Sequence, residues 1–512
     1  MIETKVLTGD DLTIDDVWAV AVERAPAALS DVARERMGAA REVVERAAHG
    51  TREHTYGVNT GFGRFVSQSI PEELTEELQV RLLRSHASGV GDPYPDEVVR
   101  AAMVLRANAL AKGYSGARVE TAELLVECLD RGLLPYVPSR GSVGASGDLA
   151  PLAHLALPLI GEGRAWVNGE LLPGDAALDR VGLQPLRLQA KEGLSLVNGT
   201  QFMAAIGALG LVRAGRLAKG ADLACALAVE ALQGSRTSFF PQIHAARPLR
   251  GQQDSAANLL HLLEDSAIIE AHRWCDQVQD AYSLRCAPQV HGAARDLLDY
   301  VRYTVSTELN SATDNPLVLV EDDLLVSNGN FHGQSLAFAL DALAMAVSEL
   351  ASISERRIER LVNPNLSGGL PAFLTTDGGL NSGFMIPQYV AASLVSENKA
   401  LCHPASVDSI PTSAGQEDHV SMGNAAGLKA WQVLANSEHA LAIELLAGAQ
   451  AVEYLAPLEP GVGARATRAF VRTLSPRLRD DRPLAGDIEA VAAAVRDGTL
   501  VEAVEGEVGE LS

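Results

Sequence analysis

The stretch from residue 335 to 350, SLAFALDALAMAVSEL, holds only two charged residues, Asp341 and Glu349. Alanine and leucine, which favour helices, fill most of the other positions. A helix that is apolar around most of its circumference belongs inside a helical bundle or at a subunit interface. Similar patterns recur on both sides, and we predict long helices over 200–233, 253–286, 289–310, 333–362, 384–402 and 424–455. The predicted fold class is mainly α, with a long central helical bundle.

The residues before about 200 predict a smaller mixed region. Thr13 and Asp16 resemble a capping box at a helix start, and Ser30 can cap a second helix that runs to about His49. Two further helices are predicted at 95–112 and 117–131, each followed by a glycine. Short strands are predicted at 5–7, 166–167 and 317–320.

The last part of the chain is broken up by prolines. A final helix is predicted there, capped by Asp487 and ended by Gly498, and an acidic tail follows it. We therefore expect three regions: a mixed N-terminal region over 1–115, a helical body over 116–455 and a helical extension over 456–512.

The composition restricts the class of protein. A net charge of −23 and a pI near 4.9 disfavour binding to nucleic acid or to an anionic membrane surface. The five cysteines are widely spaced without a CxxC pair, which is typical of reduced thiols in a cytoplasmic protein. The sequence has no signal-peptide pattern, and no uncharged apolar stretch reaches about 18 residues. We expect a soluble cytoplasmic protein.

The segment GSVGASGDL, residues 141–149, has a glycine at every third position. It could be an anion-binding loop or a tight turn, although it lacks both the GxGxxG pattern and the lysine of a P-loop. It could also react with itself, because the Gly147 amide nitrogen can attack the Ala145 carbonyl where small residues permit the bend. Loss of water from the ring and from Ser146 would leave a methylene conjugated to a carbonyl, a strong electrophile. The residues of the loop alone leave both interpretations open.

The longer segment GSVGASGDLAPLAH resembles the signature of the aromatic amino acid ammonia-lyases. In that family the Ala-Ser-Gly tripeptide becomes a 4-methylidene-imidazol-5-one (MIO) group. The resemblance therefore implies that Ala145, Ser146 and Gly147 form this group autocatalytically, that Asp148 assists, and that no external cofactor is needed. It extends over most of the chain, through YGVNTGFG (56–63), RSHASGVG (84–91), LVNGT (196–200), QDAYSLRCAPQ (279–289), TDNP (313–316), NGNFHGQ (328–334) and QEDHVSM (416–422).

Each of these motifs has a plainer interpretation when it is taken alone. Tyr56 could be a core aromatic residue, His86 a structural histidine and Asn198-Gly199 an ordinary turn. The face shared by residues 279, 282 and 285 could be an interface stripe. His419 has acidic neighbours, but no HExxH pattern or Cys/His cluster supports a metal site, and none is expected. All of these interpretations together would require several independent coincidences.

The resemblance also implies roles for the site residues. Tyr56 becomes the base that removes the β-proton, so its ordinary pKa of about 10 must be lowered by positive charge or hydrogen bonds. Arg285 holds the substrate carboxylate with a two-pronged contact. Asn198 and Tyr282 lie near the electrophile's oxygen or the substrate, and Gln279 and Phe331 line the pocket. Whether the amine or the ring of the substrate adds to the electrophile stays open.

Two residues bear on the choice of substrate. His86 fits a polar ring, either imidazole or phenol. The carboxylate of Glu417 can accept an imidazole N–H, and its burial against a plain phenyl ring would be costly. The form QEDHVSM resembles the histidine-specific members. The expected reaction is elimination of ammonia from L-histidine to give trans-urocanate, the first step of histidine degradation; the alternative is a tyrosine or phenylalanine ammonia-lyase or aminomutase.

The resemblance further implies a homotetramer in which each site draws residues from three subunits. The apolar helices agree with such an assembly. A fumarase-like tetrameric lyase is a more distant alternative, but its GSSxMPxKxN-type loop is absent from the sequence. In an acidic helical scaffold, the third alternative, the GASGD loop would be an inert turn. An intact mass lower by two waters than the sequence predicts would exclude both the fumarase-like lyase and the scaffold.

Overall fold

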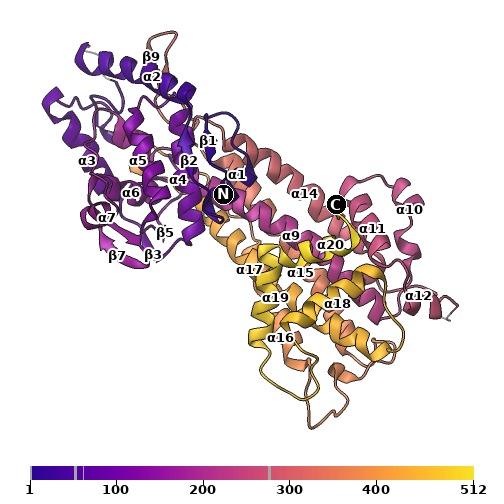
Figure 1. Cartoon of the computed structure of the whole chain (residues 1–512). Helices are drawn as coiled ribbons and strands as arrows, with labels where there is room; N and C mark the ends of the chain where they lie inside the picture. Colours follow the sequence, from indigo (N-terminus) through magenta and orange to yellow (C-terminus); the bar gives the residue numbers. More distant parts are fainter. Residues whose placement is uncertain (1–2, 51–54, 62, 275–277) are drawn as a thin grey trace. The chain divides into compact units, whose positions relative to one another are not determined.

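The computed structural model describes residues 3–50, 55–61, 63–274 and 278–512 (Figure 1). The chain divides into two compact units. The first unit comprises Met1–Val212, Val301–Asp341 and Pro404–Leu428, and the second comprises Arg213–Tyr300, Ala342–His403 and Lys429–Ser512. Four long helices begin in one unit and end in the other: α9 (Gln201–Ala231), α14 (Ala287–Glu308), α15 (Gln334–Val362) and α17 (Gly423–Val452).

The first unit mixes helices with short strands. Its other helices are α1 (Ile14–Ala21), α2 (Asp31–Gly50), α3 (Thr75–His86), α4 (Asp96–Ala111), α5 (Val119–Asp130), α6 (Leu149–Ala156), α7 (Gly174–Arg180) and α8 (Glu192–Val197). The strands form small sheets: β1 (Lys5–Leu7) pairs in parallel with β2 (Ala27–Leu29), and the remaining pairs are antiparallel. Those pairs are β3 (Val90–Pro93) with β5 (Pro138–Arg140), β4 (Leu133–Pro135) with β6 (Arg164–Val167), β6 with β7 (Glu170–Pro173), and β8 (Leu317–Leu319) with β9 (Leu324–Val326).

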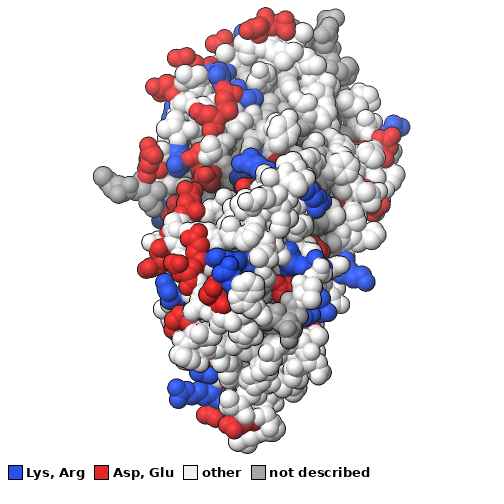
Figure 2. All heavy atoms as spheres, turned by 90° about the vertical axis from the view of Figure 1, so that its right-hand side faces the viewer, with Lys and Arg blue, Asp and Glu red and all other residues white. Residues whose placement is uncertain are grey.

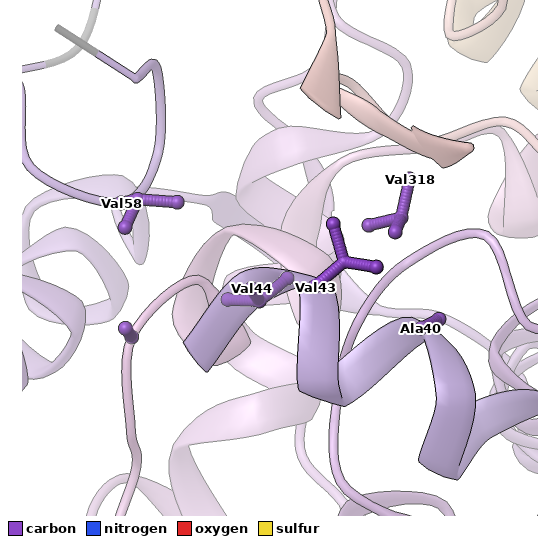
Figure 3. Close-up of a cluster of buried hydrophobic side chains, with 6 residues drawn as sticks. Ala40, Val43, Val44, Val58 and Val318 are labelled. Atoms are coloured by element: carbon purple, nitrogen blue, oxygen red, sulfur yellow. The ribbon is translucent and has the colours of Figure 1, made fainter. Parts of the chain in front are cut away.

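Helix α4 is almost wholly buried in this unit. Nearly all of its residues are buried, including Arg100, Arg106 and Asn108, and it packs against α1, α2 and α5. A second apolar cluster joins α2 to segments far away in the sequence, and Figure 3 shows five of its members, Ala40, Val43, Val44, Val58 and Val318. Because Val58 lies two residues after Tyr56, this cluster anchors the segment that carries the proposed base.

The described residues of the second unit form helices and irregular segments but no strand. Its helices are α10 (Pro241–Ala245), α11 (Arg250–Leu262), α12 (Ala267–Ala271), α13 (Tyr282–Arg285), α16 (Met385–Leu401), α18 (Val462–Leu474), α19 (Ala485–Asp497) and α20 (Thr499–Val508). Its core holds paired charges, since the buried Arg357 guanidinium pairs with the equally buried Glu444 carboxylate. Buried ions of this kind require a partner, because water no longer solvates them.

Several local predictions are confirmed. Thr13 and Asp16 form the predicted capping box of α1, and the Ala33 amide donates to Ser30 Oγ at 3.0 Å at the start of α2. The predicted strands correspond to β1, β6 and β8. The predicted helices at 95–112 and 117–131 are α4 and α5, and five of the six long helices predicted after residue 200 are α9, α14, α15, α16 and α17.

Three predictions about the second unit are wrong. The single helix predicted over 253–286 is divided into α11, α12 and α13, because Asp265 takes a left-handed φ of 58° and Ser266 caps a new helix. Residues 275–277 of this range lie outside the described residues. Asp487 lies inside the first turn of α19, whose N-cap is Leu484. The predicted acidic tail contains α20, which follows the left-handed Gly498. The region boundaries predicted at residues 115 and 455 stay predictions.

The distribution of surface charge and the apolar helix α15 both bear on the class of protein. Figure 2 shows acidic side chains gathered along the left edge of the visible face.

Among the described residues, α15 is the one helix long and apolar enough to cross a membrane by length and composition. Of its most apolar 18-residue stretch, 72% is buried within the protein. Of the five cysteines, Cys128, Cys225 and Cys286 are free thiols, and Cys275 lies outside the described residues.

Candidate functional site

The loop that carries the Ala-Ser-Gly tripeptide lies in the first unit, between β5 and α6. Gly144 and Gly147 both take left-handed φ values, 68° and 76°, which L side chains rarely adopt. A Cβ atom on Gly147 would lie 2.0 Å from the Gly199 carbonyl oxygen, so only glycine fits at this position. The sequence thus meets the steric condition for a bent Ala145–Gly147 backbone, and these residues fit the group that the motif implies.

The tripeptide pairs with the Asn198-Gly199 segment. Gly147 and Gly199 form an isolated parallel bridge. The Asp148 amide donates to the Gly199 carbonyl at 2.6 Å, and the Gly199 amide donates to the Ser146 carbonyl at 3.3 Å. Two motifs that are about fifty residues apart in the sequence therefore hold each other's backbone.

Asp148 anchors the far end of the loop. Its carboxylate is fully buried and accepts from the amides of Phe202 and Met203 at 3.0 Å each, at the start of α9, and from Ser142 Oγ at 3.3 Å. Burial raises the pKa of Asp148 to about 7, although these hydrogen bonds oppose the shift. The side chain joins the loop to the N-terminus of the longest helix.

A third segment, residues 412–422, closes over the tripeptide. The Met422 amide donates to the Val143 carbonyl at 2.9 Å, and Ala145 packs against Val420 and Met422. The Ser146 hydroxyl donates to Glu417 Oε1 at 3.3 Å. Because the other oxygen, Oε2, accepts from Thr412 Oγ1 at 2.6 Å, the Glu417 carboxylate is fixed on both sides.

Five of the predicted site residues line one cavity of about 810 Å³ in the first unit, a size that suits a small-molecule substrate. They are Tyr56, His86, Ser146, Asn198 and Glu417. Apolar side chains, among them Leu82, Leu149 and Leu194, complete much of the wall. The described lining also includes two cations, Arg64 and Arg81, of which Arg81 is paired with Glu77 on α3.

The expected lowering of the Tyr56 pKa is wrong for the single chain. Burial raises the pKa of the Tyr56 phenol above 10, and the carboxylates of Glu417 and Asp314 raise it further. Among the described residues, a hydrogen bond with the Gly63 backbone lowers the pKa and opposes this rise. The physical reason is that Glu417 and Asp314, the charged groups of the described residues that act on the phenol, are negative, and a negative neighbour disfavours the phenolate. Phe62 of the same motif lies outside the described residues.

His86 ends α3 with its ring held in one tautomer. Nδ1 lies 2.9 Å from the Leu82 carbonyl oxygen, and because a carbonyl can only accept, Nδ1 carries the proton. Burial lowers the pKa of His86 below its usual value, against the opposing effects of this hydrogen bond and of Glu417. The ring is therefore neutral at pH 7, with Nε2 as a hydrogen-bond acceptor.

Asn198 follows α8 and is 2% exposed. Its side-chain Oδ1 has no hydrogen-bond partner among the described residues, while its backbone carbonyl accepts from Arg106 Nη1 at 2.6 Å. An unpaired buried amide oxygen is uncommon in folded proteins and is available to a bound molecule.

The remaining predicted residues lie elsewhere. Gln279, Tyr282 and Arg285 belong to the second unit, where Tyr282 is 71% exposed. The Arg285 guanidinium donates to Gln279 Oε1 at 3.0 Å and lies 4.6 Å from the centre of the Tyr282 ring. Phe331 is half-buried in the first unit and is absent from the described lining of the cavity.

Thr412 and Arg106 contact site residues but were not predicted from the sequence. Thr412 lies outside the QEDHVSM motif, and its tie to Glu417 depends on a turn in which Ser413 and Ala414 both have left-handed φ values. Arg106 lies on a helix that shows no motif. No local sequence signal could have identified either residue, because both act through contacts that the fold creates.

Comparison with known proteins identifies the family. The model of the aromatic amino acid lyase family matches residues 12–475. The histidine ammonia-lyase of Gloeobacter violaceus is 57% identical over 99% of this chain and 98% of its own length, and that of Anaeromyxobacter dehalogenans is 55% identical over 97% and 99%.

Solved structures agree with the sequence matches. A histidine ammonia-lyase from Trypanosoma cruzi has a TM-score of 0.91 and 46% identity, covering 99% of this chain and 96% of that one. A tyrosine aminomutase from Streptomyces globisporus has a TM-score of 0.93 and 38% identity, covering 99% of this chain and 100% of that one. The chain belongs to the aromatic amino acid lyase family.

Proposed function

We propose that this chain catalyses the elimination of ammonia from L-histidine to give trans-urocanate, in the cytoplasm, as the first step of histidine degradation. The observation that carries this proposal is the 3.3 Å contact between the Ser146 hydroxyl and the Glu417 carboxylate, in a cavity that His86 also lines. The identity to histidine ammonia-lyases, 57% and 55% over nearly the whole chain, supports the same substrate.

The proposed electrophile is an MIO group formed from Ala145, Ser146 and Gly147. Its fit is supported by the left-handed glycines and by the 2.0 Å approach that excludes a Cβ atom at Gly147. Once formed, this group supplies an electron-poor double bond that activates the substrate for loss of ammonia. Asp148, which holds the loop against α9, is proposed to assist its formation.

Recognition of the substrate ring is assigned to two side chains. Glu417, held by Thr412, accepts the single N–H of a neutral imidazole ring, and the neutral His86 ring offers Nε2 as acceptor for the second N–H of a protonated one. A phenyl ring has no N–H to donate, so it would bury the Glu417 carboxylate without a hydrogen bond from the substrate, at a considerable desolvation cost. The polar lining therefore favours histidine over phenylalanine.

Proton removal is assigned to Tyr56. Because its pKa is raised within the single chain, the phenol needs a positive charge nearby before it can act as a base at neutral pH. We propose that Arg285, which holds the substrate carboxylate, provides that charge, while Tyr282, Gln279 and Phe331 complete the pocket and Asn198 binds near the electrophile's oxygen.

We propose that a homotetramer brings these groups together, so that each site contains residues of three subunits. The exposure of Tyr282 supports this together with that of Trp274 and Val278, which are 71%, 89% and 94% exposed. Several large apolar side chains exposed in one stretch of chain are typical of a surface that another molecule covers. The long, buried apolar helices α9, α15 and α17 are also typical of helical assemblies of this kind.

A tyrosine aminomutase or tyrosine ammonia-lyase is the second candidate. His86 could also accept from a phenol, and a tyrosine aminomutase structure is 38% identical with a TM-score of 0.93.

The two candidates differ in their products. The purified protein is given histidine, tyrosine and phenylalanine separately while the near-ultraviolet absorbance is followed. We expect a rise with histidine alone, because its product gains a double bond conjugated to the ring. A rise with tyrosine alone would support a tyrosine ammonia-lyase. An aminomutase would give β-tyrosine, which has no double bond conjugated to the ring, so its formation is followed by chromatography of the reaction mixture.

A further inference from the structure

Arg106, in α4, is a buried cation with few partners. Its side chain is 0% exposed, and its one hydrogen bond among the described residues runs from Nη1 to the Asn198 carbonyl at 2.6 Å. Nε and Nη2 have no partner among the described residues. Burial lowers the pKa of Arg106 only to about 10, with Asp314 opposing the shift, so the side chain stays charged at neutral pH.

Arg100, on the same helix, shows what a purely structural arginine looks like. It is 6% exposed and donates from Nε, Nη1 and Nη2 to the backbone carbonyls of Val20, Ala21 and Leu129. Those carbonyls belong to α1 and α5, and none of them lies in the Ala-Ser-Gly loop or in the Asn198–Gly199 segment. In the part of the chain that the structure describes, Arg106 has no such set of acceptors, so its burial is poorly explained by stability alone.

Arg106 contacts the peptide group that joins Asn198 to Gly199. The carbonyl oxygen of this group accepts from Arg106, and its N–H donates to the Ser146 carbonyl oxygen at 3.3 Å. A positive charge at the carbonyl end of an amide withdraws electrons from the nitrogen and makes the N–H a stronger donor. Through this one peptide group, the positive charge of Arg106 strengthens the hydrogen bond to the carbonyl oxygen of Ser146.

The carbonyl oxygen of Ser146 is the atom on which negative charge develops when the electrophile forms. During dehydration the Cα–H and Cβ–Oγ bonds of Ser146 break, the Cα=Cβ bond forms, and one water leaves. As the Cα proton departs, negative charge spreads onto the adjoining carbonyl oxygen of Ser146. A donor already in place at this oxygen lowers the barrier, because it stabilises charge without having to reorganise.

We propose that Arg106 is a positioning residue for electrophile formation: it acts through the Asn198–Gly199 peptide on the Ser146 carbonyl and accelerates the loss of water from Ser146. This inference rests on the proposed function, since it presumes that the tripeptide is converted. It also assigns to α4, which carries no recognised motif, a part in preparing the site.

The test follows conversion by intact mass. The full chain is synthesised in a short cell-free pulse as the wild type, Arg106→Gln, Arg106→Lys and Arg100→Gln, and its mass is measured over time. Glutamine keeps an N–H donor for the Asn198 carbonyl but no charge, whereas lysine keeps the charge. Arg100→Gln is the matched control, because it removes another buried arginine from the same helix. Circular dichroism checks folding in every sample.

We expect the wild type and Arg100→Gln to lose two waters at the same rate. Arg106→Gln should lose them about ten-fold more slowly, a smaller effect than removal of a direct oxyanion donor. Arg106→Lys should convert at nearly the wild-type rate. The near-ultraviolet band of the converted protein should also shift in Arg106→Gln, because the donor to the conjugated carbonyl is weaker.

Two results would overturn the inference. Arg106→Gln could convert as fast as the wild type, or lysine and glutamine could slow conversion equally, which would leave only a structural role. If Arg106→Gln does not fold, the decision passes to Arg106→Lys, and a folded lysine variant that fails to convert would refute the electrostatic role. A wild type that loses no water would contradict the proposed electrophile itself, which is a separate failure.

Discussion

The Ala145–Gly147 loop and the segment of residues 279–285 match the family motifs equally well, yet the structure holds them differently. The loop is fixed by backbone bonds to Gly199 and Met422 and by the buried Asp148. The 279–285 segment instead satisfies Arg285 locally, on Gln279 and on the Asp280 carbonyl, and exposes Tyr282. One region is fixed by contacts within its unit, and the other exposes residues to which we assign substrate binding.

This difference separates two tasks of the proposed site. Formation of the electrophile needs only residues of the first unit, so it should depend on that unit's contacts. Binding of the substrate carboxylate and activation of Tyr56 need a cation, which we assign to Arg285. The predictions below ask whether the two tasks can be separated by mutation.

The largest effect is expected from Ser146→Ala. Without the hydroxyl group no dehydration can occur, so the protein should keep the mass of its sequence, and turnover of histidine should fall by about 10³-fold or more. Intact mass and ammonia release measure the two effects. Ser139→Ala is the matched control, because Ser139 Oγ donates to the Asp92 carbonyl on β3 and should not affect either quantity. Loss of two waters from Ser146→Ala would refute the assignment of the tripeptide.

Tyr56→Phe should separate chemistry from electrophile formation. We expect kcat to fall by about 10²–10⁴-fold, as for loss of a general base, while the loss of two waters is unchanged. The pH dependence sharpens this point. Because a higher pH gives more phenolate, kcat/KM of the wild type should rise with pH, and the rise should be absent in Tyr56→Phe. A kcat that survives the substitution would remove Tyr56 from the mechanism.

Arg285→Gln tests the second region. KM for histidine should rise about ten- to a hundred-fold, the effect of losing a charged hydrogen bond. The pH at which kcat/KM levels off should move upward, because the Tyr56 pKa, already raised by burial, would lose its positive neighbour. The control is Arg64→Gln, since Arg64 lines the cavity in the first unit. If Arg64→Gln raises KM and Arg285→Gln does not, the carboxylate is held by the first unit.

Glu417→Gln should change the choice of substrate. Loss of the carboxylate should lower kcat/KM for histidine about ten- to a hundred-fold and should leave the weak reaction with phenylalanine unchanged or improved. Parallel kinetics with the two amino acids measure the ratio. An equal loss with both substrates would show that Glu417 serves the chemistry rather than ring recognition.

The smallest effect is expected from Thr412→Val. Without the 2.6 Å bond from Oγ1, the Glu417 carboxylate loses one constraint, and KM for histidine should rise about three- to ten-fold with little change in kcat. Thr412→Ser keeps the hydroxyl group and should restore the wild-type KM. If serine behaves like valine, the backbone turn, and not the hydrogen bond, orients Glu417.

Sequence patterns predicted the regular parts of the fold well. The positions of α9, α15 and α17 follow from long apolar runs, and the start of α1 follows from Thr13 and Asp16. The break after α11 was missed because it depends on tertiary contacts: the Val462 amide donates to the Glu264 carbonyl, and Ser266 donates to the buried Glu230. Such long-range contacts leave no periodic signal.

The candidate site likewise combines residues that sequence motifs predict with properties that only the folded chain creates. The motifs brought Tyr56, His86, Ser146, Asn198 and Glu417 to attention, and the structure places them around one cavity. The direction of the Tyr56 pKa shift could not be predicted, because it depends on burial and on two carboxylates distant in the sequence. The contacts of Thr412 and Arg106 likewise arise only when the chain has folded.

Subunit complementation tests the central claim that each site needs both regions, contributed by different chains. Tyr56→Phe and Arg285→Gln chains are co-expressed in equal amounts, and the mixed oligomers are purified. They are assayed with histidine well below the wild-type KM, where each variant alone should show about a tenth of the wild-type rate or less. If Tyr56 and Arg285 of one site come from different chains, about a quarter of the sites regain both residues, and activity should return to about a quarter of the wild-type value. Mixed oligomers that stay as inactive as either variant alone would contradict the account.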